Sequence, residues 1–300
     1  MVYESRYVTC QVIFMIQFQP SSSYRGDLGK EPTIVVHDCH GEGLFSNKNL
    51  IRLLNSVSPE KIKTKIPSQK WQEVFNTRKI SPPELVELFD SDDNDCWIVL
   101  HEIENTPMLR RLFLEMAAAL TSSLPPTYGQ VKLCTGSLFI SRGAATTPFH
   151  MDYGSNLLLQ LRGNKRFLAF SPNDPELVSK QSLREFFGGD ANPPSLKYDP
   201  AFDTKALILN LEPGLGLYMP STSPHCTETR DHDLSVTISL SFVCPLADRI
   251  RRSALFDRKL PRLRFLPDGL KYGVATCYEM LRQTRGDYHP RHESFKPLVS

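Results

Sequence analysis

Between residues 131 and 243 the chain repeats one pattern, a short apolar run of β-forming residues followed by a turn. The turns are rich in Gly, Pro, Asn and Asp, as in Arg162-Gly163-Asn164 and Glu212-Pro213-Gly214. Short strands at such turn-bounded intervals are typical of an antiparallel barrel or jelly roll. The pattern therefore predicts a mainly β protein with flanking helices, whose core is an antiparallel barrel or a jelly roll. The expected strands are 131–140, 156–161, 166–170, 206–211, 216–219 and 234–243.

The segments on either side of this β-rich region have helical features. Ser46 precedes a run with helical apolar spacing, and proline stands at the first turn of expected helices over 82–89 and 106–119. We expect a further short helix near 181–187 and two more over 248–258 and 268–282. The expected organisation is a weakly specified N-terminal segment (1–30), a mainly helical N-terminal wrap (31–126), a β-rich core (127–245, with an insertion at 175–200) and a helical C-terminal segment (246–300).

Composition excludes several classes of protein. Hydrophobic residues make up 40% of the chain and charged residues 23%, which is ordinary for a globular domain. The longest apolar candidate, 12–18, falls well short of the roughly 18 residues that a membrane span needs. The seven cysteines are scattered without a CxxC pair, and the N-terminus lacks a signal-peptide pattern. We therefore expect a cytoplasmic protein with free thiols and no membrane association.

The charge distribution bears on partners. The formal net charge is +2, but residues 245–300 carry 12 Lys and Arg against 6 Asp and Glu. This bias is a modest hint of an acidic partner and not the one-sided basic footprint of a nucleic-acid binder. Apolar residues such as Phe256, Leu263 and Phe265 give the C-terminal helices a surface that could form a homodimer or cover the barrel of the same chain.

The main chemical candidate is the sequence Thr147-Pro-Phe-His150-Met-Asp152. In a strand, residues i and i+2 point to the same face, so His150 and Asp152 would lie side by side towards the barrel interior. His225, after Tyr218-Met-Pro-Ser-Thr-Ser-Pro, is a third candidate ligand. Two histidines and a carboxylate leave the opposite side of an ion open, as in non-haem Fe(II) oxygenases. By itself an HxD pair is a weak signal, because a solvated strand can carry it by chance.

The residues around this pair make the signal more specific. Thr147 stands three positions before His150, Lys165 follows a Gly-containing turn, and His225 follows a Tyr-apolar-Pro entry. In this order the residues resemble the JmjC-type, or cupin-like, 2-oxoglutarate oxygenases, nearest to the asparaginyl hydroxylase branch. The resemblance covers about residues 131 to 245. It implies that the core at 127–245 is a double-stranded β-helix, the jelly roll of this family, and that this core is the catalytic part of the chain.

The resemblance implies roles for individual residues. His150, Asp152 and His225 would hold Fe(II), with 2-oxoglutarate and O2 as co-substrates. Lys165 and Thr147 would bind the distal carboxylate of 2-oxoglutarate, and Asn156 would lie near its iron-binding end. A buried carboxylate needs a compensating charge and hydrogen bonds, which an ammonium and a hydroxyl supply.

The substrate side departs from the family pattern. Ser241 stands where the asparaginyl hydroxylases have a second asparagine, and segment 97–102 lacks the tyrosine expected from the pre-barrel region. Candidate substrate contacts are Arg142, Tyr153 and Ser241. A guanidinium at Arg142 would suit a substrate carboxylate, although a surface arginine is an equal alternative.

The resemblance implies an oxidoreductase of the dioxygenase class that oxidises an unactivated C–H bond, by hydroxylation, ring closure or desaturation. A small amino-acid-like metabolite, as in natural-product biosynthesis, is favoured as substrate because no reader domain or zinc module accompanies the barrel. The alternatives are a JmjC-type protein side-chain hydroxylase, a non-catalytic cupin-like binding or regulatory protein, and a Zn or Mn cupin isomerase or lyase. The intact group of three ligands together with Lys165 argues against the binding protein. Lys165 and Thr147 argue against the isomerase or lyase, for which a 2-oxoglutarate site is superfluous.

Other polar clusters have simpler interpretations. His37-Asp38-Cys39-His40 holds ligand-type residues, but adjacent loop residues rarely converge on one ion, so we expect a polar loop. His289 and His292 belong to an expected solvated tail. Cys226, next to His225, would point to the opposite strand face as a buried thiol.

Overall fold

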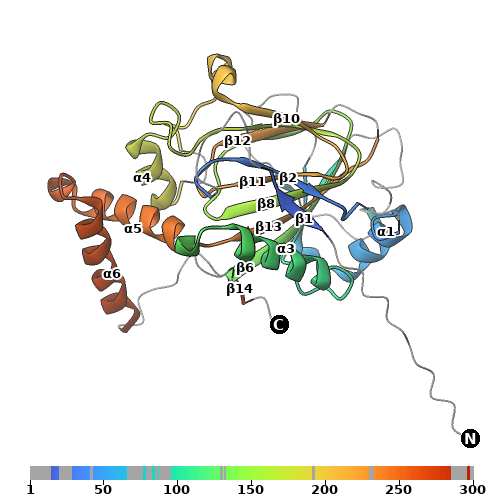
Figure 1. The fold of residues 1–300 in the computed structure, drawn as a ribbon, viewed down its shortest axis with the longest axis horizontal. Helices are drawn as coiled ribbons and strands as arrows, with labels where there is room; N and C mark the ends of the chain where they lie inside the picture. Colours follow the sequence, from blue (N-terminus) through green and yellow to red (C-terminus); the bar gives the residue numbers. More distant parts are fainter. Residues whose placement is uncertain are drawn as a thin grey trace, which may run out of the picture.

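A computed structural model describes residues 15–19, 29–40, 43–65, 77–78, 83–84, 87, 96–128, 131, 133–190, 193–229, 233–284 and 296–297, and every structural statement below concerns these residues. Two antiparallel sheets face each other in it, with helices at one side and beneath (Figure 1). The predicted mainly β architecture with a jelly-roll core is confirmed.

The larger sheet has ten strands in the described part of the chain. Its order is β1-β2-β11-β8-β13-β6-β5-β3-β4, and β14 also pairs with β6. Its strands are β1 (Ile16–Phe18), β2 (Thr33–His37), β3 (Ile62–Lys65), β4 (Thr77–Arg78), β5 (Cys96–His101), β6 (Leu133–Arg142), β8 (Ser155–Arg162), β11 (Leu215–Met219), β13 (Ser235–Phe242) and β14 (Lys296–Pro297).

The smaller sheet has the order β10-β9-β12-β7. Its strands are β7 (Ala145–His150), β9 (Lys165–Ala169), β10 (Leu207–Leu211) and β12 (His225–Thr229). Together with β6, β8, β11 and β13 of the larger sheet, they form the eight-stranded jelly roll. All six strands expected from 131–243 are present, within two residues at each end.

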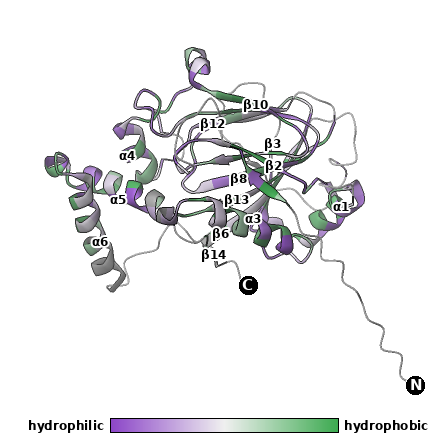
Figure 2. Ribbon diagram, viewed as in Figure 1, coloured by the Kyte–Doolittle hydropathy of each residue, from purple (hydrophilic) through white to green (hydrophobic). Residues whose placement is uncertain are grey.

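Helices cover the outer face and one end of the barrel. They are α1 (Asn47–Ser56), α3 (Arg110–Ser123), α4 (Lys180–Gly188), α5 (Pro245–Lys259) and α6 (Asp268–Thr284), with short 3-10 helices η1 (Pro59–Lys61), η2 (Pro126–Tyr128), η3 (Pro200–Lys205) and η4 (Pro261–Leu263). α1, α4 and α5 mix hydrophilic and hydrophobic residues along their length, as helices that cover one face of a core do (Figure 2). Of the expected helix over 82–89, only residues 83–84 and 87 are described, and they are helical.

The main apolar core lies between α3 and the outer face of the large sheet. Leu112, Phe113 and Met116 of α3 are buried in one cluster with Leu138 and Ile140 of β6. At about 25 cal/mol per Å² of apolar area, a cluster of this kind is the main source of stability for the barrel wall. The inner face of the same sheet lines the cavity described below.

The stretch 31–126 contains the helices α1 and α3, and with them strands that were not expected there. β2, β3 and β5 lie in it and extend the large sheet beyond β11 and β6. The segment 96–101 is a short continuous apolar run, for which periodicity cannot separate strand from helix. Pairing with β6 over six registered positions makes it a strand. The expected domain boundaries themselves stay predictions.

The C-terminal helices extend to one side of the barrel, with α4 between the sheets and α5 (Figure 1). A buried ion pair joins α5 to α6, in which Lys271 Nζ lies 2.8 Å from Asp257 Oδ1. Apolar side chains are exposed here, among them Phe265 in the turn between η4 and α6 and Leu270 of α6. In the described part of the chain, no helix has the length and apolar character to cross a membrane.

Candidate metal centre

A cavity of about 550 Å³ opens between the inner faces of the two sheets. The large sheet contributes side chains from β5, β6, β8 and β13, and the small sheet contributes them from β7, β9 and β12. Its polar lining includes Lys63, His101, Ser137, Thr147, His150, Asp152, Tyr153, Asn156, Lys165, His225, Ser239 and Ser241.

Three of these residues form a group with metal-ligand character. The donor atoms of His150, Asp152 and His225 all lie within 4.8 Å of one another, and the described residues contain no second group of this kind. His150 Nε2 is 3.7 Å from Asp152 Oδ1, and His225 Nε2 is 3.8 Å from Asp152 Oδ2. The sequence separates His225 from the other two by more than seventy residues, so pairing of β7 with β12 brings them together.

Both imidazoles are held in the orientation that a metal ligand needs. His150 Nδ1 lies 2.7 Å from the carbonyl oxygen of Pro148, and His225 Nδ1 lies 3.0 Å from that of Ser223. A carbonyl only accepts, so each Nδ1 carries the hydrogen and donates. The lone pair is thereby on Nε2, which faces Asp152. Such outer contacts fix tautomer and ring direction at metal sites.

Burial keeps the ring of His225 neutral. Desolvation, with a further contribution from the neighbouring His150 ring, lowers the pKa of His225 well below its usual value. A neutral imidazole is the form that binds a metal. The His225 ring also stacks on Phe167, with centroids 5.6 Å apart and planes 10° apart.

Asp152 is the most exposed of the three, with 44% of its side chain accessible. Asn156 donates from Nδ2 to Asp152 Oδ2 at 2.8 Å. The amide oxygen of Asn156 in turn accepts from Ser241 Oγ, with Ser239 Oγ at 3.5 Å. Ser241 and Asn156 thus form a chain that orients the carboxylate.

His150 and Asp152 were expected to lie side by side on one strand, and only His150 does lie on a strand. His150 is the last residue of β7, whereas Asp152 lies in the turn that leads to β8. That turn is tied to the loop before β12, because Thr222 N donates to Asp152 O at 2.9 Å and Ser221 Oγ donates to Tyr153 O at 2.6 Å. The two loops therefore hold the ligands from both sides of the cavity mouth.

Thr147 reaches the cavity through an irregularity in β7. His225 pairs with His150 and Thr227 with Thr147, so two residues of β12 span three of β7. This β-bulge lets Thr147 and His150, which an unbroken strand would point apart, both line the cavity. Pro148, which has no N–H to donate, lies within the bulge.

Lys165 points into the same cavity from the start of β9 and is only 6% exposed. Its Nζ lies 5.9 Å from the Phe139 ring centroid, and none of the carboxylates that the structure describes pairs with it. Burial lowers the pKa of Lys165 from 10.5 to about 8. A buried ammonium without an acidic partner is costly, and an anionic ligand would relieve that cost.

The three candidate substrate residues have different outcomes. Tyr153 and Ser241 line the cavity. Arg142 does not line it, because it occupies the same strand face as Leu138 and Ile140, towards the outer core, and pairs in register with buried Cys96. The expectation of Arg142 as a substrate contact is corrected accordingly, since side chains alternate along β6.

One wall of the cavity was not expected from the sequence. Trp97, Val99 and His101 of β5 line it from the segment that lacks the family tyrosine. His101 Nδ1 lies 3.1 Å from Ser137 Oγ, and burial lowers the pKa of His101 to about 4. The alternation of Trp97, Val99 and His101 was the available signal, but the continuous apolar run obscured it.

The remaining polar clusters are structural. His37 is buried at the end of β2, where Nε2 contacts Leu215 O at 3.1 Å and Nδ1 accepts from Cys39 N. Cys226 is buried in the apolar cluster outside the small sheet, as its place next to His225 predicts. The six described cysteines are free. His289 and His292 lie outside the described residues.

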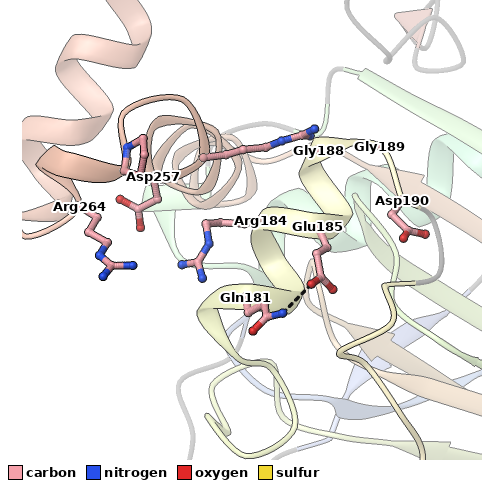
Figure 3. A pocket seen from close by; sticks show the side chains of 10 residues that line it. Gln181, Arg184, Glu185, Gly188, Gly189, Asp190, Asp257 and Arg264 are labelled. Carbon is pink, nitrogen blue, oxygen red and sulfur yellow. Dashed lines mark hydrogen bonds between the residues drawn. The ribbon is translucent and has the colours of Figure 1, made fainter.

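A second, larger hollow of about 920 Å³ lies between α4 and the end of α5 (Figure 3). Arg184, Arg258 and Arg264 alternate there with Glu185, Asp190 and Asp257, so its charges are mixed. Glu185 accepts from Gln181 and Ser195, and Asp257 pairs with Lys271. This hollow has no group of metal ligands, so the inter-sheet cavity is the candidate functional site.

Fold and site together define a jelly-roll protein with an open two-histidine, one-carboxylate centre inside the barrel. The residues present fit a metal of the Fe(II) kind, because two imidazole nitrogens and a carboxylate converge and none of the described thiols closes the site. A model of the cupin-like domain matches residues 52–242. The chain therefore belongs to the cupin-like family, whose domain broadly fits the 2-oxoglutarate oxygenase class.

Individual relatives are more distant. The chain is 34% identical over 112 residues to the HSPB1-associated protein 1 homolog of Danio rerio, and 32% identical over 112 residues to HSPB1-associated protein 1 of Mus musculus and of Homo sapiens. Each match covers 35% of this chain and 22–24% of the relative, so the chain spans about a quarter of these proteins. Among solved structures, the X-ray structure of E. coli ycfD aligns over 92% of this chain and 70% of its own, with a TM-score of 0.49 and 16% identity.

Proposed function

We propose that this protein is an Fe(II)- and 2-oxoglutarate-dependent dioxygenase that oxidises an unactivated C–H bond of a small amino-acid-like molecule. The observation that carries the proposal is the presence, in one cavity, of the His150–Asp152–His225 group and the buried Lys165. A site that binds only a metal does not explain the buried ammonium of Lys165. A site that binds a metal and a dicarboxylate explains both the three ligands and the lysine.

The roles of the chain's own residues follow from their positions. His150 and His225 offer Nε2 and Asp152 offers a carboxylate oxygen to the metal, while Asn156 holds that carboxylate in place. Lys165 binds the distal carboxylate of 2-oxoglutarate, with the Thr147 hydroxyl as a second contact. When bound, the metal and its co-substrate supply dioxygen activation for C–H oxidation. Apolar walls such as Phe139 and Phe167 keep water out of the cavity.

A small-molecule substrate is supported by the cavity itself. Its volume of about 550 Å³ lies in the range of enclosed ligand sites, and 2-oxoglutarate fills only part of such a volume. The product could be hydroxylated, cyclised or desaturated, and a role in natural-product biosynthesis is part of the same proposal. A protein side-chain hydroxylase is the alternative.

Partners and location are proposed on the same basis. We expect a small molecule as the primary partner, no nucleic acid, and a cytoplasmic protein. A homodimer through the C-terminal helices is supported by exposed apolar side chains from η4 to α6, namely Leu263, Phe265, Leu270 and Val274.

The proposal is tested without knowing the substrate. Anaerobic protein is titrated with Fe(II) and then with 2-oxoglutarate, and the visible metal-to-ligand charge-transfer band of the chelate is recorded. We expect a saturable band, lost in His225→Ala and strongly weakened in Lys165→Met. His40→Ala, which removes an exposed histidine outside the cavity, is the matched control and should leave the band intact.

Two outcomes would count against this function. Metal binding without a 2-oxoglutarate-dependent band would favour a Zn or Mn cupin isomerase or lyase. Protein that binds no metal at all would favour a binding or regulatory protein.

A further inference from the structure

The cavity holds a second lysine, Lys63, that the proposed metal and 2-oxoglutarate contacts do not use. It comes from β3 and lies opposite Val99 of β5 in the sheet register. Side chains directly opposite in an antiparallel pair share one face, and Val99 faces the cavity. The neighbouring Thr64 is buried on the other face. Lys63 is an exposed residue that also lines the cavity, so it stands at the cavity rim, beside the wall formed by β5.

The side chains that line the cavity give the solvated ammonium of Lys63 no acidic partner. Asp152 is the only acidic side chain among the described residues that line it, against two lysines. When a divalent metal and doubly charged 2-oxoglutarate are bound, their two charges cancel each other, and the charges of Asp152 and Lys165 also cancel. Lys63 makes no ion pair with any carboxylate that the structure describes. One positive charge thus faces the remaining space of the cavity.

Next to Lys63 stands a hydrogen-bonding group of matching geometry. His101 lies two residues beyond Val99 on β5, and the charge of Lys63 acts with burial in keeping its ring neutral. Its Nδ1 contacts Ser137 Oγ. When the serine hydroxyl donates to Nδ1, the Nε2–H of His101 is left to donate to a ligand. An ammonium and an N–H on one wall suit a carboxylate, which accepts from both.

We propose that Lys63 and His101 bind a carboxylate of the primary substrate, so that the substrate is a small organic acid such as an amino acid or an N-acyl amino acid. This inference rests on the proposed function and names the substrate class of the same site. A single uncompensated positive charge matches a carboxylate better than a doubly charged phosphate. Anchoring at the rim leaves the rest of the acid to extend towards His150 and Asp152.

The experiment measures binding, not turnover. Protein loaded with Zn(II) and the unreactive 2-oxoglutarate analogue N-oxalylglycine is examined by ligand-observed NMR. The probes are the N-acetyl derivatives of the twenty standard amino acids, each as the free acid and as its carboxamide. We expect at least one acid to bind about tenfold more tightly than its amide, the effect of one charge-assisted contact.

Variants assign that preference to Lys63. Lys63→Gln should reduce the preference to about twofold or less, and Lys63→Arg should retain it. Lys61→Gln is the matched control, because Lys61 lies on η1 beside Glu102 and not in the cavity. A wild-type protein that prefers no acid to its amide, or a preference that survives in Lys63→Gln, overturns the inference.

N-Oxalylglycine binding, followed in the same samples, separates the two proposals. If the analogue binds in a Lys165-dependent manner while no acid is preferred, only the substrate inference fails. If the analogue does not bind, the proposed function fails, whatever the acid preference. If Lys63→Gln weakens the analogue as much as Lys165→Met does, Lys63 belongs to the 2-oxoglutarate site and the inference is overturned.

Discussion

Asn156 holds Asp152 by a 2.8 Å hydrogen bond to Oδ2, the carboxylate oxygen that faces His225 Nε2. The bond links a residue inside β8 to one in the turn before it. Asn156 is itself held by Ser241 of β13, the next strand of the sheet. The direction of the candidate metal ligand is thus determined by the rigid large sheet and not by its own turn.

This relationship predicts a loss of metal affinity in Asn156→Ala. Without the amide, the half-exposed carboxylate can rotate away from the two imidazoles. Outer contacts of this kind are worth about 10- to 100-fold in affinity. Isothermal titration with Mn(II) measures the change, and Asn210→Ala, an exposed position on β10, is the control. Unchanged affinity in Asn156→Ala would show that the hydrogen bond does not orient the ligand.

The 2-oxoglutarate affinity should decrease as the pH rises through about 8. Below this value Lys165 is an ammonium that can pair with a carboxylate, and above it the free protein carries a neutral amine. Above this value, each further pH unit should lower the affinity by up to about tenfold, until the pH reaches the pKa that Lys165 has in the complex. Titrations with N-oxalylglycine between pH 6.5 and 9.5 measure this. Affinity that is flat across that range would argue against Lys165 as the carboxylate partner.

Lys165→Met should stabilise the fold while it removes co-substrate binding. The folded-state pKa of Lys165 lies below its unfolded value of 10.5, so the unfolded chain binds the proton more tightly. The lysine therefore destabilises the fold by about 3 kcal/mol below pH 8, and the penalty fades as the pH rises towards 10.5. Urea unfolding at pH 7 and pH 10 should show a gain for Lys165→Met at pH 7 only.

Gly136 is required by the close approach of β6 and α3. A Cβ at this position would lie 2.4 Å from Cζ of Phe113. Gly136→Ala should therefore destabilise the protein by about 1–3 kcal/mol, as overpacking does. Adding Phe113→Leu should restore part of the loss. Gly269→Ala, where no atom lies within 4 Å of the new Cβ, should show no such loss in thermal unfolding.

The Lys271–Asp257 pair should anchor α6 to α5. Both side chains are buried, with 2% and 9% exposed. Lys271→Met leaves a buried carboxylate unpaired and should cost about 3–5 kcal/mol of unfolding free energy. The double variant Lys271→Met with Asp257→Leu should recover most of it, and exposed Lys180→Met should be neutral. Equal stabilities of the single and double variants would contradict a role for the pair.

Much of the fold could be predicted from the sequence because local sequence patterns specify its strands and helices. Runs such as 156–161 and 234–243 have β-forming residues bounded by turns, and the structure places β8 and β13 there. The helix from 106 onward likewise follows its apolar spacing and appears as α3. Segment 96–101 was not predicted as a strand, because its strand character depends on pairing with β6, more than thirty residues away.

The sequence by itself determined the jelly-roll class and the chemical types of the candidate site residues, His150, Asp152, His225 and Lys165. Tertiary structure decided how they are used. The bulge in β7 turns Thr147 inward, strand alternation turns Arg142 outward, and Asp152 lies in a turn instead of on a strand. The physical reason is the range of the forces involved. Turn chemistry and side-chain periodicity act between near neighbours, whereas the direction of a side chain at a bulge depends on a strand paired from far along the chain.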